Sequence, residues 1–275
     1  MLDSNILECI TPLILTYNEA PNISRTLEQL TWAKRIVVID SYSTDDTLDI
    51  LRSYPQVEIF KREFDTHTLQ WNYGLEIVKS EWVLSLDADY VLSKELIEEI
   101  KCISPQTDID GYFIRFEYCI FGKPLRGTIL PPRQALFRKS KSIYIDDGHT
   151  QLLEVRGKQD ILKNSIYHDD RKPLSRWLWA QDRYMLIEIK KILETPTQEL
   201  SLGDKIRKQK YIAPLIIFFY CLILKGGIWD GKAGWYYAYQ RMLAEILLSI
   251  RLIESEKLNK IISKSTQYSL STNVK

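Results

Sequence analysis

The chain has 275 residues, of which 45% are apolar and 27% charged, and its formal net charge is +1. This length and composition fit one large globular domain or a domain with an appendage, and the lack of basic excess excludes a dedicated nucleic-acid-binding protein. Four scattered cysteines without a C-x-x-C pair, and an N-terminus without a signal-peptide pattern, predict a reduced, cytoplasmic protein with neither a disulfide framework nor a zinc site.

The first hundred residues alternate between strand-like and helix-like segments. Apolar runs rich in β-forming residues predict buried strands over residues 9–18, 35–41, 57–62 and 81–89. Helical spacing follows the first three of these runs. We expect the second helix to begin at Ser43, because Ser43 and Asp46 form a capping-box pattern. This β-α repetition predicts a mostly parallel sheet covered by helices on both faces.

Polar residues stand where the predicted strands end. They are Asn18, Asp40 and the pair Asp87 and Asp89. Because α/β sheets bind ligands at the carboxyl ends of their strands, we expect these residues to form one site. Asp87 and Asp89 are two positions apart, which places both on one face of a strand. Two carboxylates so close repel each other unless a cation or several hydrogen-bond donors meet them.

From about Gly111 the pattern changes to short strand-like segments joined by Gly/Pro turns. The segment "IYIDDGHTQLLEV" (143–155) is dense in polar residues. Pro173 stands at a favourable helix start. The long helix predicted after it carries one stripe of side chains, namely Trp177, Ala180, Tyr184 and Ile187.

The last third of the chain contains an uncharged apolar run over residues 211–224. Its fourteen residues are fewer than the roughly 20 needed to span hydrocarbon. A buried core helix is one interpretation. We favour a helical hairpin at the cytoplasmic leaflet, because lysines and aromatic residues flank the run. The following helix carries an apolar face made of Trp235, Tyr239, Met242, Leu243, Ile246, Leu247 and Ile250.

The turn after the first strand bears on how phosphate is held. It reads "LTYNEAPN" (15–22) and has no glycine, so neither a dinucleotide fingerprint nor a P-loop is present. Backbone amides therefore do not cradle phosphates there. The remaining way to hold a diphosphate is a divalent cation, which Asp87 and Asp89 are placed to bind. Magnesium or manganese takes such oxygen ligands and shares them with substrate phosphates.

Three motifs carry a resemblance to a known family. "PLILTYNEAPNI" (12–23), "IVVIDSYSTDDT" (36–47) and "LSLDADYVLS" (84–93) resemble the opening motifs of family 2 glycosyltransferases of the GT-A fold. "DDGHTQLLEVRG" (146–157) and "GGIWDGKAGWYYA" (226–238) look like a bacterial branch that builds surface polysaccharides, including lipopolysaccharide-core glycosyltransferases. Many members of that branch carry a His-Glu pair where this chain has His149 and Thr150.

The resemblance implies the fold and its division. We expect an α/β GT-A fold, with a mostly parallel sheet flanked by helices and a C-terminal helical, membrane-associating extension. The catalytic domain would cover residues 1–195, and the membrane-interface hairpin residues 196–275. Within the catalytic domain we expect a nucleotide-sugar half, an acceptor half and a closing helix, covering residues 1–110, 111–172 and 173–195.

The resemblance also implies roles at the donor site. Thr16, Tyr17 and Glu19 would frame the nucleotide base, and Asp40 would accept a hydrogen bond from its imide N–H. That hydrogen bond favours UDP or dTDP, because cytosine has no such donor. Gln70 would line the donor pocket. Asp87 would contact the ribose or reach the metal through water, and Asp89 would ligate Mn²⁺ or Mg²⁺.

An inverting transfer also needs a base for the acceptor hydroxyl. We predict Asp147 for this role, with Asp146 as the alternative. His149 is a candidate metal ligand. His168, Arg171 and Lys172 are candidates for binding the diphosphate or the acceptor.

The motifs and candidate site residues lead to one functional hypothesis and two alternatives. The hypothesis is a metal-dependent, inverting hexosyltransferase, peripheral on the cytoplasmic face of the inner membrane. It would use a UDP-sugar donor and a surface-glycan or lipid-linked saccharide acceptor, and no nucleic acid. A polyprenyl-phosphate glycosyl synthase is one alternative, because a lipid phosphate needs no strong base. A non-catalytic glycosyltransferase-like partner in an assembly complex is the other.

Overall fold

The computed structural model describes residues 5–147 and 150–272, apart from the side chains of residues 147, 150 and 258–272. The chain divides into two compact units, residues 1–172 and 173–275. The helix that follows Pro173 therefore groups with the C-terminal helices, whereas the sequence placed it with the catalytic domain. The reason is its packing on the last helix, described below.

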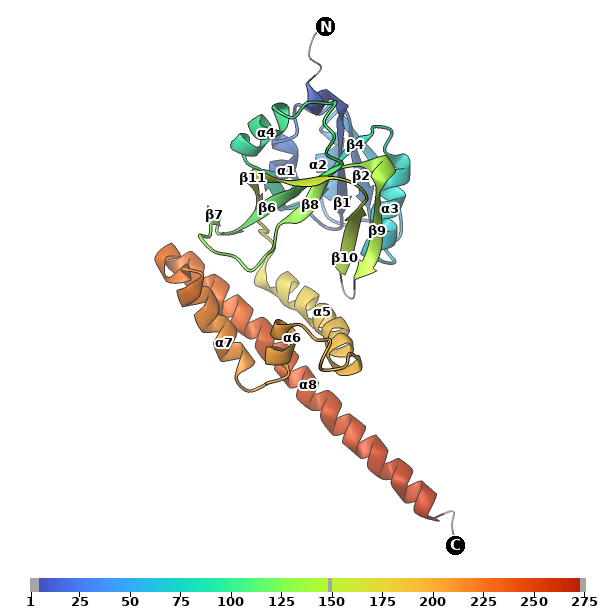
Figure 1. Ribbon diagram of the computed structural model, residues 1–275, viewed down its shortest axis with the longest axis vertical. Helices are drawn as coiled ribbons and strands as arrows, with labels where there is room; N and C mark the ends of the chain where they lie inside the picture. The colour runs from blue at the N-terminus through green and yellow to red at the C-terminus, as the bar shows by residue number, and fades with distance from the viewer. Residues whose placement is uncertain (1–4, 148–149, 273–275) are drawn as a thin grey trace. The chain divides into compact units, whose positions relative to one another are not determined.

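The first unit is built on a large sheet. Its strands, with those of a separate hairpin, are β1 (Ile10–Thr16), β2 (Ile36–Asp40), β3 (Val57–Lys61), β4 (Trp82–Asp87), β5 (Tyr90–Leu92), β6 (Gly111–Ile120), β7 (Lys123–Pro124), β8 (Arg133–Arg138), β9 (Ser142–Asp147), β10 (Thr150–Val155) and β11 (Gln159–His168). Among the described residues the large sheet has nine strands in the order β3-β2-β1-β4-β8-β6-β11-β5, with β7 beside β6 (Figure 1). Strands β9 and β10 form the separate antiparallel hairpin.

The four N-terminal strands are parallel, as their continuous apolar sequences predict. Beyond β4 the sheet becomes mixed, because β8 runs antiparallel to both β4 and β6. Strand β11 is again parallel to β6, and the short β5 closes the edge in the antiparallel direction. The predicted α/β fold with a mostly parallel sheet is therefore confirmed.

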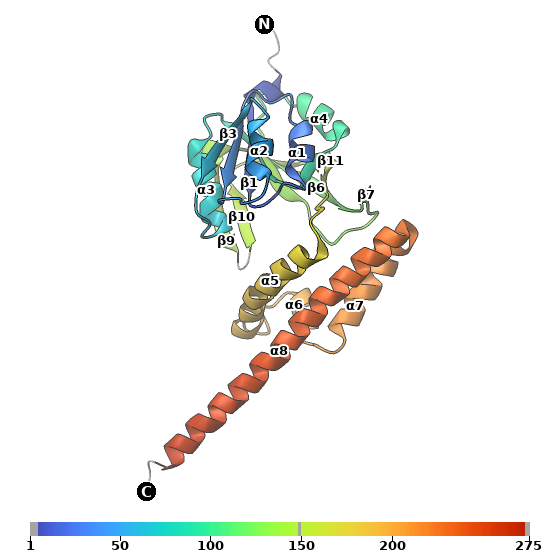
Figure 2. The same cartoon turned by 180° about the vertical axis from the view of Figure 1, so that it is seen from behind.

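Helices cover both faces of this sheet. They are α1 (Ile23–Glu28), α2 (Thr47–Arg52), α3 (His67–Ile77) and α4 (Lys94–Lys101), with 3₁₀ turns at Ile6–Cys9 and Lys139–Lys141. Helices α1, α2 and α4 lie on one face, and α3 lies on the other with the β9–β10 hairpin (Figures 1 and 2).

Alternating strand residues supply the two cores. Ile14 and Leu84 pack on the α1 side, and their neighbours Leu13 and Val83 pack on the α3 side. Asn72 of α3 fixes the hairpin, because its side chain makes two hydrogen bonds, of 2.9 and 3.0 Å, with the backbone of Tyr144.

The start of α2 differs from the prediction. The helix begins at Thr47, with Asp46 at the N-cap position, and not at Ser43. The Ser43 hydroxyl and amide both donate to the carboxylate of Asp40, at 2.5 and 2.9 Å. Ser43 thus forms its hydrogen bonds with a buried carboxylate at the sheet edge and not with the first turn of the helix. This interaction keeps residues 41–46 out of the helix.

The second unit is helical. Its elements are α5 (Leu174–Glu194), α6 (Leu202–Arg207), α7 (Ala213–Phe219), a π-helical turn (Tyr220–Leu224), a 3₁₀ turn (Gly227–Asp230) and α8 (Lys232–Thr272). Helix α5 packs on α8 through an apolar cluster made by Ile189, Ile192, Leu248 and Leu252. The stripe predicted for α5 does not provide this contact, since Tyr184 and Ile187 are exposed.

A charged cluster lies beside this apolar contact. Arg207 of α6 donates to Glu188 of α5 at 2.8 Å and to Glu245 of α8 at 3.1 Å. It also contacts Asp204 at 3.2 Å. Both glutamate side chains are at least nine-tenths buried. One guanidinium therefore joins three helices and compensates the buried acids.

The segment 211–224 is not one continuous α-helix. It contains α7 and the π-helical turn, and α7 packs on α8 with Phe218 at 5.5 Å from Tyr239 and 6.0 Å from Trp235 between ring centroids. Gly234 allows close packing at the start of α8, because a Cβ there would meet the carbonyl oxygen of Gly227. In the part of the chain that the structure describes, no helix has the length and apolarity needed to cross a membrane.

Candidate active site

The candidate site lies at the carboxyl ends of β2, β1 and β4. Strand β1 is between the other two, so Thr16 lies beside Asp40 in β2 and Leu15 beside Asp87 in β4. This register brings together polar residues that are 24 to 71 positions apart in the sequence. The edge is where open α/β sheets bind ligands.

Asp40 is fully buried at this edge. Its Oδ2 accepts hydrogen bonds from the hydroxyls of Thr16, at 3.0 Å, and Ser43, at 2.5 Å. Its Oδ1 accepts the Ser43 amide. A carboxylate offers about four acceptor positions, so Oδ1 keeps one lone pair for a further donor.

Gln70 lies behind this loop and not in an open pocket. It is fully buried, and its amide donates to the Ser41 hydroxyl at 2.9 Å and to the Arg62 carbonyl at 3.2 Å. Arg62 in turn donates to the Gln70 side-chain oxygen. The side chain thus fixes the segment that follows Asp40.

Two tyrosines flank Asp40 on the surface. Tyr17 follows β1 and Tyr42 follows β2, and both are exposed. Tyr42 has a positive φ of 61°, an unusual backbone conformation for a bulky residue. Such strain occurs where the surrounding structure holds a residue for a function. Tyr42 is a site candidate that sequence reasoning missed.

Asp87 and Asp89 do not lie on one face of a continuous strand, which corrects the geometry expected from their spacing. Strand β4 ends at Asp87, the chain turns, and β5 begins at Tyr90. Asp87 faces a cavity, as described below. Asp89 is 8% exposed, and its carboxylate lies 3.1 Å from Nε2 of His168 at the end of β11.

Asp89 and His168 shift each other's pKa. Burial alone would raise the pKa of Asp89, but His168 and then Lys172 outweigh burial and lower it. Burial would lower the pKa of His168, but Asp89 and then Asp87 raise it. Nδ1 of His168 is buried without a hydrogen-bond partner among the described residues. His168 thus lies within electrostatic reach of both motif aspartates.

Glu19 belongs to the same cluster and does not lie with the two exposed tyrosines. It forms an ion pair with Lys172 and accepts a hydrogen bond from Asn22 at 2.9 Å. Burial and the charge of Asp89 raise the pKa of Glu19 to about 7, against the opposing effect of Lys172. Lys172 therefore lies between two acidic groups near the end of β4 and remains a cation.

Arg171 points elsewhere. Its guanidinium donates to Oδ2 of Asp169, at 2.8 and 3.0 Å, and Arg25 of α1 donates to the same oxygen. Together these residues line a shallow crevice on the α1 side of the sheet. The sequence grouped Arg171 with Lys172, but the structure brings only Lys172 to Asp89.

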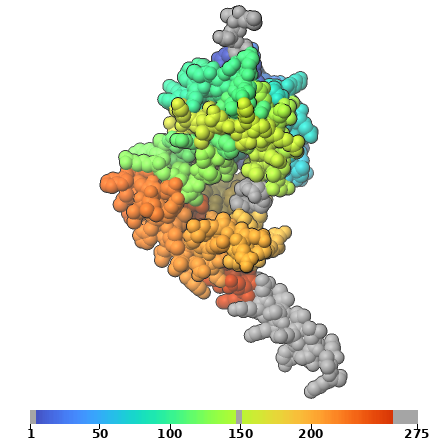
Figure 3. Space-filling model, in the orientation of Figure 1, coloured from blue at the N-terminus to red at the C-terminus, as the bar shows by residue number. Residues whose placement is uncertain are grey.

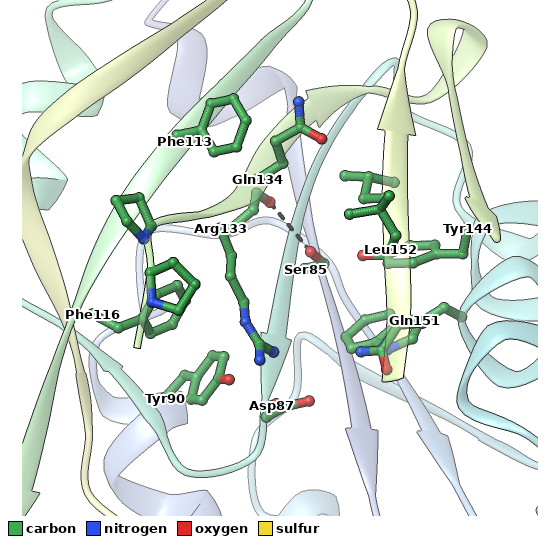
Figure 4. A pocket seen from close by; sticks show the side chains of 15 residues that line it. Ser85, Asp87, Tyr90, Phe113, Phe116, Arg133, Gln134, Tyr144, Gln151 and Leu152 are labelled. Atoms are coloured by element: carbon green, nitrogen blue, oxygen red, sulfur yellow. Dashed lines mark hydrogen bonds between the residues drawn. The ribbon is translucent and has the colours of Figure 1, made fainter. Parts of the chain in front are cut away.

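A cavity of about 370 Å³ opens beside Asp87 (Figure 4). Phe113 and Phe116 of β6 and Leu152 of β10 give it apolar walls. The hydroxyl group of Tyr90, the guanidinium of Arg133 and the carboxylate of Asp87 lie together at one end. Tyr144 stacks on Trp71 with ring centroids 5.3 Å apart.

The predicted bases lie on the hairpin that borders this cavity. Asp146 of β9 is exposed and pairs with Gln151 of β10. Paired residues of antiparallel strands share a face, as do residues two apart. Asp146 therefore shares the face of Gln151 and Tyr144, which both line the cavity. The side chain of Asp147 and the whole of His149 lie outside the described residues.

The carboxylates at this edge suit a divalent cation that is also bound by a substrate. Such a cation needs only one or two protein carboxylates when phosphates supply other ligands. Asp87 and Asp89 provide that number. Within residues 5–147 and 150–272, no three His, Cys, Asp or Glu side chains are assembled to hold a metal by themselves. The arrangement thus fits Mg²⁺ or Mn²⁺ with a diphosphate, and not an enclosed metal centre.

Sequence similarity extends along the first half of the chain. Residues 13–120 match the Glycosyl transferase family 2 domain. An uncharacterized glycosyltransferase of Rickettsia bellii is 35% identical over 104 residues, which are 38% of this chain and 35% of that protein. The chain thus spans about a third of the length of that relative. The lipopolysaccharide core biosynthesis glycosyltransferase LpsC of Rhizobium meliloti is 22% identical over 259 residues, covering 90% of this chain and 93% of LpsC.

A solved structure supports the fold. The mannosyltransferase PcManGT of Pyrobaculum calidifontis, in complex with GDP-Man and Mn²⁺, has a TM-score of 0.51 and 13% identity to this chain. The match covers 89% of this chain and 86% of that protein. Residues 13–120 are therefore similar to the Glycosyl transferase family 2 domain, and the chain has a fold of the GT-A type.

Proposed function

We propose that the protein is an inverting glycosyltransferase that moves a hexose from a UDP-sugar to a surface-glycan or lipid-linked acceptor. The observation that carries the proposal is the common edge of β2, β1 and β4, which holds a buried carboxylate, Asp40, and the pair Asp87 and Asp89. The family 2 domain and the similarity to LpsC support the reaction class and the surface-glycan acceptor.

In this proposal Asp40 receives the nucleotide base. The free lone pair on its Oδ1 accepts the imide N–H of uracil, and Thr16 and Ser43 hold the carboxylate in place. Tyr17, after β1, and Tyr42, after β2, supply exposed rings suited to stacking on a base. Gln70 acts indirectly, by fixing the loop.

The diphosphate lies at the end of β4. Asp87 and Asp89 would hold Mn²⁺ or Mg²⁺, which supplies positive charge against the charge that develops on the departing nucleotide. His168 and Lys172 lower the pKa of Asp89, and Lys172 places a further cation near the leaving group. Asp146 is our choice of base for the acceptor hydroxyl, because its strand face borders the cavity beside Asp87.

Calorimetry of UDP binding tests the donor site. We expect UDP to bind at least about tenfold more tightly with Mn²⁺ than with EDTA, because no glycine loop holds the diphosphate. A thermal-shift series with UDP-, dTDP- and GDP-sugars then tests which nucleotide base the site prefers. Equal UDP affinity in EDTA would contradict the metal assignment, and preference for GDP would contradict the assignment of a uracil base.

We further propose that the second unit binds a membrane surface. The predicted apolar face of α8 stays partly exposed at Trp235 and Tyr239, although both rings contact Phe218 of α7. Figure 3 shows α7 and the residues after it, in orange, at the molecular surface. Large apolar side chains exposed in this region include Tyr211, Ile212, Leu215, Phe219, Ile223, Leu224 and Trp229. Lys225 and Lys232 add positive charge that suits an anionic leaflet.

Vesicle sedimentation tests this surface. We expect the full chain to bind vesicles that contain anionic lipid, and the Leu224→Asp/Trp229→Asp variant to lose most of this binding. Both residues are more than 70% exposed, so the substitutions leave the helix packing intact. Leu69→Asp, which changes an exposed residue of α3, is the matched control. Equal sedimentation of all three proteins would refute the proposal.

A further inference from the structure

The cavity beside Asp87 contains a cation that the donor site does not use. Arg133, at the start of β8, has no hydrogen bond or ion pair from its guanidinium to any described residue. Figure 4 shows this guanidinium turned into the cavity, between Tyr90 and Asp87. Among the described residues that line the cavity, Asp87 is the other charged side chain.

The walls suit a sugar ring. Apolar and aromatic side chains form most of the surface, and a few polar groups converge on the interior, as in small-molecule sites generally. The hydroxyl of Tyr90 and the amide of Gln151 offer hydrogen bonds to ring hydroxyls. The volume of about 370 Å³ is within the range of such pockets.

The guanidinium determines which sugar fits. Among the described residues that line the cavity Asp87 is the one anion, and under the proposed function it is committed to the donor. Arg133 is then left without a counter-charge beside an aromatic wall. A planar guanidinium in such a place favours a carboxylate or a phosphate, which it binds through two parallel hydrogen bonds.

The position of the cavity favours the acceptor over the donor. Strands β4, β6 and β8 and the β9–β10 hairpin line it, whereas β1 and β2 hold the proposed base site at Asp40. The strand face of Asp146 borders the cavity, so a hydroxyl of a ring bound there would lie on the side of the proposed base.

We propose that this cavity binds an acceptor sugar that carries a carboxylate or phosphate group, and that Arg133 pairs with that anion. The proposal rests on the proposed transferase function, because it assigns Asp87 to the donor. Arg133 is a specificity residue in this assignment.

Ligand-binding NMR on the full chain, with UDP and Mn²⁺ present, tests the proposal. The probes are hexuronic acids and hexose 6-phosphates, each compared with its neutral parent hexose. We expect at least one acidic sugar to bind about tenfold more tightly than its parent, as a charge-assisted hydrogen-bonded pair provides. Arg133→Met should remove this preference, Arg133→Lys should keep part of it, and Arg156→Met, at an exposed position outside the cavity lining, should leave it unchanged.

Separate measurements distinguish the possible failures. UDP affinity should stay within about twofold in Arg133→Met, and a tenfold loss would assign Arg133 to the diphosphate and overturn the proposal. A preference for UDP-glucuronate over UDP-glucose that disappears in Arg133→Met would place the anion on the donor and also overturn it. If no acidic sugar is preferred while UDP binds normally, the inference fails and the transferase proposal stands. Absence of UDP binding in the unmodified chain would instead defeat the transferase proposal itself.

Discussion

Asp89→Asn is expected to lower sugar transfer by about 10²- to 10³-fold, the usual cost of removing one group that stabilises developing charge. The substitution removes a buried negative charge but keeps an oxygen that accepts a hydrogen bond from His168. Loss of the charge weakens the hold on a divalent cation and leaves His168 and Lys172 without their shared anion. The measurement is the initial rate of transfer from the donor that the thermal-shift series identifies.

The matched control is Asp108→Asn. Asp108 is an exposed carboxylate paired with an exposed lysine, Lys158, so its neutralisation should leave both rate and stability nearly unchanged. The thermal midpoint of Asp89→Asn should remain close to that of the unmodified chain, because the hydrogen bond is retained. Normal turnover in Asp89→Asn would remove this carboxylate from the mechanism.

Arg207→Met is expected to destabilise the second unit by about 3–5 kcal/mol, the range found when one partner of a buried ion pair is removed. The substitution removes the guanidinium that pairs with the buried carboxylates of Glu188 and Glu245 on adjacent helices. Urea unfolding gives the free-energy change. Hydrogen exchange in α5 and α8 shows whether the loss falls on these helices.

Two further variants make this result interpretable. Arg251→Met removes an exposed ion pair with Asp182 and should change stability by no more than about 0.5 kcal/mol. The triple change of Arg207, Glu188 and Glu245 to Met should recover much of the loss, because apolar residues can replace a buried charge network. Unaltered exchange in α5 and α8 of Arg207→Met would show that the cluster does not hold the three helices together.

Several features of the molecule follow from the sequence alone. Continuous apolar runs predict β2 and β4 as buried strands, and Asp40 and Asp87 stand at their ends. Side-chain alternation and helical spacing depend on residues two to four positions apart, so a short segment contains the whole signal. Parallel pairing then brings the strand ends to one edge, which is why the position of the candidate site is predictable.

Other features depend on contacts between distant residues. Ser43 has the pattern of a helix cap, yet the buried charge of Asp40 is its stronger partner. Arg171 and Lys172 are adjacent in the segment after β11, but Arg171 pairs with Asp169 and Lys172 pairs with Glu19, so only Lys172 reaches Asp89.

The cavity beside Asp87 and the cluster around Arg207 also depend on contacts between distant residues. Arg133 is unremarkable in its own segment, and its isolation as a cation arises only when β4, β6, β8 and β10 meet around it. Arg207 lies 19 residues from Glu188 and 38 from Glu245. Local patterns thus determine the strands, the helices and the sheet edge that carries the candidate site. Tertiary packing decides which charges are buried, which are compensated and which remain available, because desolvation and charge pairing depend on distance in space.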